Sequence, residues 1–139
     1  MPTRPDDVCL NKAAIIERAI RRLRDEYASD PELQSFTHID ALTLNIERAC
    51  QAAIDLSMHL VARERLGMPQ NSADAFRMLA KAGLVSAPTV RAMVAMTGFR
   101  NIAIHEYQEM DMGVLRHIAQ DGYKSLIVLC EELGLVIRP

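Results

Sequence analysis

The sequence predicts an all-α fold, an antiparallel bundle of about five helices. Half of the 139 residues are apolar, yet only 4% are aromatic and tryptophan is absent. A core of Leu, Ile, Val, Ala and Met suits helices better than a sheet, in which aromatic and β-branched residues are enriched. Apolar residues also recur at helical spacing, and no stretch alternates between apolar and polar residues as a half-buried strand would.

The first helix is expected over roughly residues 5–28. Its apolar stripe consists of Ile16, Ile20, Leu23 and Tyr27, in steps of four, three and four. Its opposite side carries Arg18, Arg21, Arg22 and Arg24. These arginines have two interpretations, a solvated face balanced by neighbouring acids or a local patch for nucleic acid.

A second, long helix is expected to follow the Ser-Asp-Pro-Glu run at 29–32 and to continue to about Leu66. This run predicts a stop and a restart, because it offers a capping residue, a proline that a first turn tolerates and then an acid. The apolar residues of the second helix at helical spacing are Ile39, Leu42, Ile46, Ala49, Ala53 and Leu60.

Three shorter helical segments are predicted after the loop at 67–71. Ser72 is expected to cap the third helix, which ends at Gly83. Ser86, with Pro88 in the first turn, opens a fourth helix that runs towards His105. Asp111 caps a fifth, which Gly134 ends.

Composition indicates one domain, residues 1–139, in the cytoplasm. The length suffices to bury a core without disulfides or metal. The three scattered cysteines, Cys9, Cys50 and Cys130, favour reduced thiols over a disulfide framework or a zinc site. Charges from Arg4 to Asp7 interrupt any apolar signal core, and no stretch of 18 apolar residues predicts a membrane span. The net charge of −2 means that nucleic acid would need a local basic patch.

The chemistry concentrates in residues 100–107, Arg-Asn-Ile-Ala-Ile-His-Glu-Tyr. An arginine can hold a phosphate through two parallel hydrogen bonds, a histidine can move a proton near neutral pH, and a tyrosine offers a hydroxyl that can be modified. Such groups suit metal-independent phosphodiester chemistry. The sequence has no glycine-rich phosphate loop and no nucleophile elbow, and we expect neither a cofactor nor a metal.

Helix geometry constrains this segment. Arg100 and His105 are five residues apart, so an unbroken helix would place them about 140° apart around its axis. A site that contains both therefore requires the helix to end near His105 or a second copy of the chain to complete the site. Each residue also has an ordinary structural interpretation: His105 as a helix cap, and Arg100 as the partner of an acid such as Glu106 or Glu109.

The pattern Gly-Phe-Arg-Asn followed by His-x-Tyr resembles the signature of the HepT-type toxins, all-helical ribonucleases of the HEPN superfamily. The resemblance extends to the order of the helices. It implies metal-independent RNA cleavage by a homodimer whose two motifs face a shared cleft. It also implies an antitoxin, a minimal nucleotidyltransferase that adenylylates the motif tyrosine. Arg100 and His105 would then be catalytic, Asn101 the accompanying polar residue and Tyr107 the modification site.

Two alternatives to the enzyme stay open at this point. One is a non-catalytic helical module that binds a nucleotidyltransferase partner or a nucleotide, with Arg100 and His105 holding a phosphate. The other is a plain structural dimer. The presence of both Arg100 and His105 favours the enzyme, because a general acid–base and a cation are what metal-free RNA cleavage requires.

Overall fold

The computed structural model describes residues 4–105 and 111–139, and of residues 104 and 105 it describes the backbone alone. Within these ranges every regular element is helical, as predicted. The helices are α1 (Asp7–Ser29), α2 (Phe36–Arg63), α3 (Ser72–Lys81), α4 (Ala87–His105), α5 (Met112–His117) and α6 (Lys124–Glu132), and a π-helical segment (Ile118–Gly122) joins the last two.

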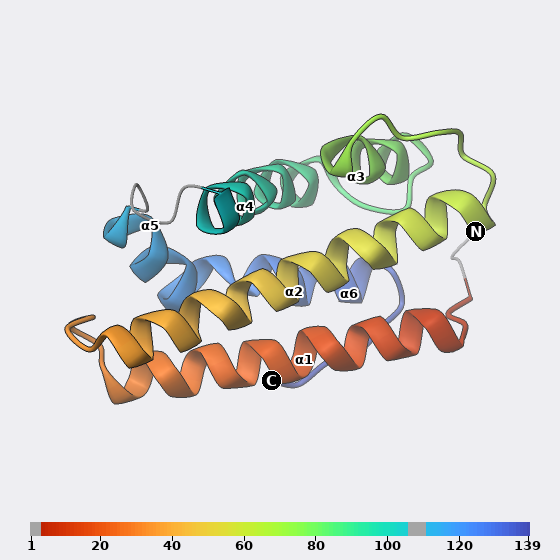
Figure 1. The fold of residues 1–139 in the computed structure, drawn as a ribbon. Helices are drawn as coiled ribbons and strands as arrows, with labels where there is room; N and C mark the ends of the chain where they lie inside the picture. The colour runs from red at the N-terminus through yellow and green to blue at the C-terminus, as the bar shows by residue number, and fades with distance from the viewer. Residues whose placement is uncertain (1–3, 106–110) are drawn as a thin grey trace.

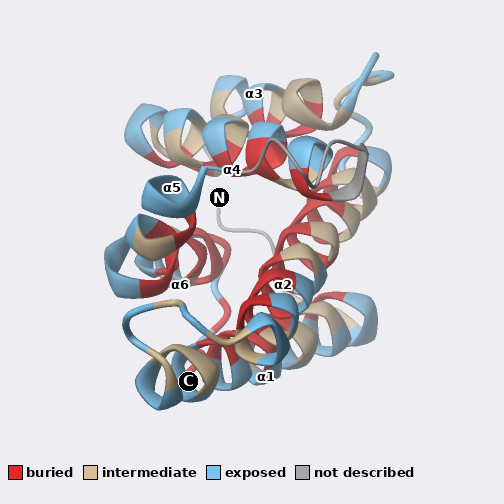
Figure 2. Ribbon diagram, turned by 60° about the vertical axis from the view of Figure 1, so that its left-hand side comes forward, coloured by how far each residue is buried: buried red, intermediate tan, exposed pale blue. Residues whose placement is uncertain are grey.

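Helices α1 and α2 form a long antiparallel pair, and α3 and α4 lie along the opposite side of the bundle (Figure 1). Buried residues line the inward faces of the helices, and exposed residues lie outward (Figure 2). The predicted stripe of α1 is confirmed, since Ile16, Ile20 and Leu23 are fully buried. Tyr27 is only half-buried, and its hydroxyl accepts a hydrogen bond from Gln120 Nε2 at 2.7 Å.

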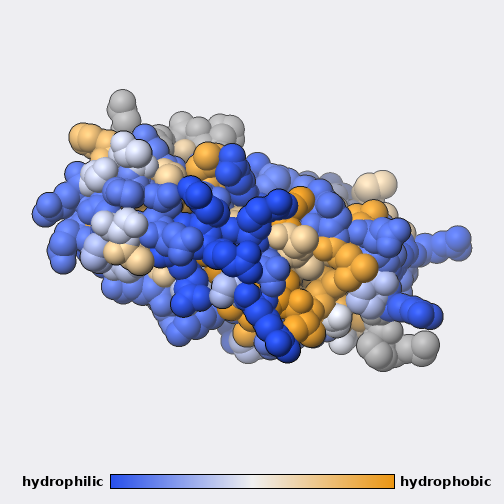
Figure 3. Space-filling model, turned by 90° about the horizontal axis from the view of Figure 1, so that it is seen from below, coloured by the Kyte–Doolittle hydropathy of each residue, from blue (hydrophilic) through white to orange (hydrophobic). Residues whose placement is uncertain are grey.

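Seen from below, most of the molecular surface is hydrophilic, and hydrophobic surface gathers towards one end (Figure 3). The arginines of α1 are exposed, as the solvated-face interpretation expects. Arg22 pairs with Glu26 at 3.0 Å, and Arg21 and Arg24 donate to the carbonyl oxygens of Arg138 and Pro139. No helix in the described part of the chain is both long and apolar enough to cross a membrane.

The predicted start of α2 near Pro31 is wrong by several residues. Asp30 uses both carboxylate oxygens to accept the backbone N–H groups of Gln34 (3.1 Å) and Ser35 (2.8 Å), which holds the intervening residues in a turn. Leu33 has a φ of 53° inside this turn and packs against the core. The side chain of Ser35 then caps α2.

α2 also ends earlier than predicted, at Arg63. The N–H of Leu66 donates to the Val61 carbonyl at 3.0 Å and that of Arg65 to the Ala62 carbonyl at 3.2 Å, the paired bonds of a Schellman motif. Arg65 takes the left-handed position with a φ of 55°. Glycine usually holds this position, so the sequence carried no signal for the stop.

Two further predicted boundaries need correction. Asn71, not Ser72, caps α3, because its Oδ1 accepts the N–H of Asp74 at 2.9 Å while Asp74 accepts that of Gln70 at 3.0 Å. The single helix predicted after Asp111 is interrupted, since Tyr123 N donates to the Ile118 carbonyl five residues back. Asp111 does cap α5, and Gly83 and Gly134 are left-handed, as their predicted role as helix stops requires.

Candidate functional site

Helix α4 positions Arg100 and Asn101. Ser86 caps its first turn through Thr89 and Val90, with Pro88 inside that turn, as predicted. Around Arg100 the helix is anchored by buried neighbours, Met96, Phe99 and Ala103. Because these residues face the core, Arg100 is half-buried beside α2 while Asn101 is exposed.

The guanidinium of Arg100 is incompletely paired within the described residues. Its Nε atom is buried and has no hydrogen-bond partner, and its Nη1 donates only a long bond of 3.4 Å to Asn101 Oδ1. A buried donor without an acceptor costs free energy, so such atoms in native proteins call for an explanation. An anion such as a phosphate would supply the missing acceptor.

Two groups of α2 face this arginine, and sequence reasoning identified neither. Burial raises the pKa of the Glu47 carboxyl, and the Arg100 guanidinium opposes that shift by favouring the carboxylate. Burial raises the pKa of the Cys50 thiol to about 12, so this cysteine stays protonated and is no nucleophile near neutral pH. Among the described residues Glu47 is thus an acid whose charge Arg100 stabilises. The predicted ion-pair partners Glu106 and Glu109 lie outside the described residues.

The other half of the motif is not described. His105 is the last residue of α4 with a described backbone, and its side chain and the whole of Tyr107 lie outside the described residues. The convergence of Arg100 and His105 therefore stays a prediction. The structure brings Arg100, Asn101 and Glu47 together.

A second polar cluster ties the start of α1 to α2. Asp6 Oδ1 caps Cys9 N at 3.0 Å, and Asp6 Oδ2 accepts from His59 Nε2 at 2.7 Å and Arg63 Nη1 at 2.9 Å. These bonds, the Cys9 N–H first, hold the pKa of Asp6 well below its usual range. His59 is thus paired with the Asp6 carboxylate.

Asp6, Cys9 and His59 could in principle ligate a metal ion, because their ligand atoms lie within 4.8 Å of one another. Two features oppose this. The cation Arg63 already occupies the carboxylate and lies 3.9 Å from Cys9 Sγ, and burial raises the pKa of that thiol, which disfavours the thiolate a metal needs. The cluster therefore has a structural role, because it ties the start of α1 to α2.

The structure is a helical bundle in which α4, the helix before the last two, carries Arg100 and ends at His105, as the resemblance to the HEPN superfamily implies. Residues 15–133 match the family model described as Ribonuclease HepT-like. The chain therefore belongs to the HepT-like family.

Named relatives agree with this assignment. The chain is 38% identical to the mRNA nuclease HepT of Shewanella oneidensis over 116 residues, which cover 83% of this chain and 87% of the relative. It is 28% identical to the tRNA nuclease HepT of Aphanizomenon flos-aquae over 87 residues, 63% of this chain and 56% of the relative.

Solved structures agree as well. The tri-AMPylated Shewanella oneidensis HEPN toxin in complex with MNT antitoxin matches with a TM-score of 0.89 and 34% identity, over 94% of this chain and 98% of that one. A toxin–antitoxin complex with AMP-PNP matches with the same TM-score and 33% identity, over 93% and 98%.

Proposed function

We propose that this chain is the toxin of a toxin–antitoxin pair and that it cleaves RNA without a metal ion. The observation that carries the proposal is the half-buried Arg100, whose Nε has no acceptor among the described residues, in a chain that matches the Ribonuclease HepT-like family model. The names of its relatives, mRNA nuclease and tRNA nuclease, support RNA as the substrate. The proposal includes one domain over residues 1–139 and a location in the cytoplasm, which suits three free cysteines.

The chemistry assigns each motif residue a role. The RNA 2′-hydroxyl attacks its neighbouring phosphorus, the bond to the 5′-oxygen breaks, and a 2′,3′-cyclic phosphate and a 5′-hydroxyl result. One histidine accepts the proton of the 2′-hydroxyl, and another donates a proton to the leaving 5′-oxygen. Arg100 stabilises the charged phosphorane, and the Asn101 amide oxygen orients the guanidinium.

Because each motif holds one histidine, two copies of the chain supply the acid and the base. We place the contact between copies where α4 meets α5. A pocket of about 170 Å³ opens there between α4 and the α5–α6 segment, with Met96, Phe99 and Val114 in its lining. Val114 in this lining, and Ile102 and Met112 on the same two helices, each expose about 40% of their surface, as apolar residues of an interface do in the separated chain.

Val114→Asp is expected to shift the protein from dimer to monomer and to reduce cleavage in parallel, because a carboxylate would be buried unpaired in the apolar contact. Sedimentation velocity at micromolar concentration measures the first effect and an RNA cleavage assay the second. Val8→Asp, at a similarly exposed valine on α1, is the matched control and should stay dimeric. A wild-type chain that is monomeric and active contradicts the proposed dimer.

Glu47→Gln is expected to lower cleavage roughly tenfold through misplacement of Arg100 without loss of stability. Since burial raises the pKa of Glu47, the stability it contributes is fully present below the ordinary carboxyl pKa and is lost as pH rises through the raised value. The Gln variant lacks this loss, so its melting temperature at pH 7 should equal or exceed that of the wild type. A variant that is less stable at pH 7 and cleaves normally would show that Glu47 is only a structural ion-pair partner.

The proposed partners are an RNA substrate, a second copy and a minimal nucleotidyltransferase antitoxin that adenylylates Tyr107; no membrane is involved. The solved toxin–antitoxin complexes, one with a tri-AMPylated toxin, support the partner and the type of modification. The direct test is cleavage of RNA by the purified chain in EDTA. Cleavage that EDTA abolishes rejects the metal-independent mechanism. No cleavage at all, together with tight binding to the nucleotidyltransferase, would favour the non-catalytic module.

A further inference from the structure

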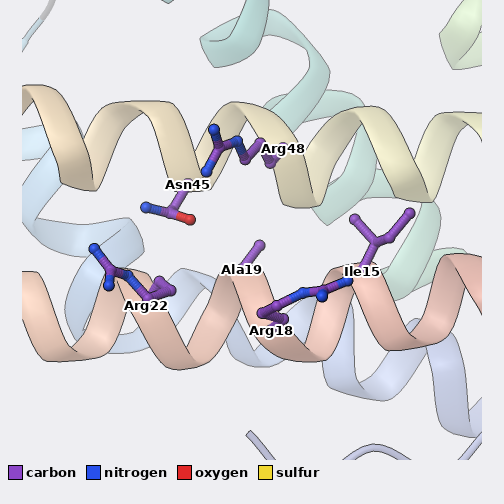
Figure 4. Close-up of a pocket in the computed structure, with 6 residues that line it drawn as sticks. All are labelled: Ile15, Arg18, Ala19, Arg22, Asn45 and Arg48. Carbon is purple, nitrogen blue, oxygen red and sulfur yellow. The ribbon is translucent and has the colours of Figure 1, made fainter.

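An open groove runs between α1 and α2, outside the Arg100 site. Its volume is about 450 Å³, and its described lining is Ile15, Arg18, Ala19 and Arg22 from α1 with Asn45 and Arg48 from α2 (Figure 4). Two small or short side chains on facing helices, Ala19 and Asn45, are both 3% exposed and leave the space. Asn45 is fixed in place, since its Nδ2 donates to the Ala41 carbonyl at 2.8 Å.

The groove concentrates positive charge in a chain whose net charge is −2. Arg18 and Arg48 are exposed, and neither forms an ion pair within the described residues. Arg22 forms an ion pair with one carboxylate oxygen of Glu26, and His38 binds the other oxygen at 2.7 Å. Arg22 therefore shares this carboxylate with a second residue. No acid belongs to the described lining, so the local potential is positive.

The arginines are spread along the groove. In Figure 4, Arg18 extends along α1 towards Ile15, whereas Arg22 and Arg48 extend towards the end at which Asn45 lies. A site for one phosphate would bring its cations to one point. Cations distributed along an open channel instead suit an extended polyanion with regularly spaced charges.

The groove and the Arg100 site share helix α2. Arg48 follows directly after Glu47, the acid that faces Arg100 from α2. Successive residues of a helix point about 100° apart, and a helix with its side chains is about 10–12 Å across. A flexible, extended polyanion that crosses over α2 could therefore lie in the groove and also reach Arg100.

We infer that this groove binds the sugar–phosphate backbone of single-stranded RNA next to the bond that is cut, an inference that rests on the proposed function. An acidic protein segment would also attract arginines. The described lining, however, offers only Ile15 and Ala19 as apolar residues, and protein interfaces depend on buried apolar or aromatic anchors. Backbone binding to RNA needs no such anchor, because neutralised phosphates supply the affinity.

The test compares RNA binding by the full chain and by its Arg18→Gln/Arg48→Gln variant, both carrying His105→Ala so that the RNA stays intact. The probe is a fluorescein-labelled oligouridylate of 12 nucleotides, measured by anisotropy from 50 to 300 mM KCl. We expect Kd to rise roughly tenfold at 100 mM KCl and the slope of log K against log salt to fall by about 0.7 for each lost phosphate contact. Arg18→Lys/Arg48→Lys should keep most of the slope, because lysine keeps the charge.

The matched control is Arg77→Gln/Lys81→Gln, which removes two exposed positive charges from α3. It should leave Kd within about twofold, since long-range interactions between exposed charges are screened at this salt concentration. An equal effect of control and groove variants would overturn the inference in favour of net charge. Unchanged RNA affinity of the groove variant, with loss of binding to a polyglutamate peptide, would assign the groove to an acidic protein segment instead.

Binding and cleavage are read separately, which distinguishes this inference from the proposed function. If the groove variants lose RNA affinity but the wild-type chain does not cut RNA, the result supports RNA binding in the groove and rejects the proposed ribonuclease activity. If the wild type cuts RNA and the groove variants bind it normally, the reverse holds. Circular dichroism of each variant confirms that these exposed substitutions leave the helices intact.

Discussion

His105→Ala and Arg100→Ala are each expected to lower the rate of RNA cleavage by about 10²–10⁴-fold, the usual contribution of a general acid–base or of a group that stabilises developing charge. For Arg100 the reason lies in its geometry, because its guanidinium is half-buried and its Nε has no acceptor among the described residues, so a bound phosphate would supply one. For His105 the reason is chemical, since cleavage without a metal needs a proton acceptor and a proton donor. Single-turnover cleavage of a labelled RNA in EDTA measures both effects.

Controls separate catalysis from folding. Arg77→Ala, at an exposed arginine of α3, should cleave at the wild-type rate. Arg100→Lys should stay severely impaired, because lysine keeps the charge but not the two-pronged geometry for phosphate. Loss of helical signal in the alanine variants would make the residues structural, and full activity in either would remove it from the mechanism.

The helices themselves were predictable because their signals are local. Three-to-four spacing of apolar residues marks one buried face, as Ile16, Ile20 and Leu23 show. Asp111 predicts the start of α5, because a carboxylate before a helix accepts the first N–H groups of that helix, here those of Gly113 and Val114. The same physics operates in any chain context, so no tertiary information was needed.

The predicted helix boundaries were wrong where a residue other than glycine adopts the left-handed conformation. Leu33 and Arg65 adopt left-handed conformations that glycine normally adopts, so the turn before α2 and the stop after it carry no glycine signal. The π-helical interruption before α6 is hidden for another reason. The helical apolar spacing continues across it, with Leu115, Ile118 and Leu126 all buried.

The candidate site also has one part that the sequence predicts and another that only the folded structure assembles. Arg100 and Asn101 were predicted as site residues because they stand in a short contiguous motif. Glu47 was not predicted because it stands 53 residues before Arg100 in the sequence, and only the packing of α2 against α4 brings the two residues close. The arginines of α1 were noticed, but Arg48, which completes the groove with them, lies on a different helix and adds nothing to a local charge pattern.

Tyr107→Phe is expected to make the toxin resistant to its nucleotidyltransferase. In the proposed modification the Tyr107 oxygen attacks the α-phosphorus of ATP, the α–β anhydride bond breaks, pyrophosphate leaves and the phenolic proton passes to a base. The resulting phosphodiester carries a negative charge two residues from His105 and competes with RNA for Arg100. Blocking a charge-stabilising group of this kind should lower cleavage by roughly 10²-fold or more, and phenylalanine has no oxygen to modify.

Co-expression with the partner, followed by mass spectrometry and an RNA cleavage assay, tests this directly. Wild-type chain should carry adenylate on the peptide that contains Tyr107 and cleave poorly, whereas Tyr107→Phe should be unmodified and fully active. Tyr27→Phe is the matched control: Tyr27 is half-buried and its hydroxyl is engaged by Gln120, so this variant should still be silenced. If Tyr107→Phe is neutralised as well as the wild type, the antitoxin acts by binding alone, because a steric partner does not depend on one phenolic oxygen.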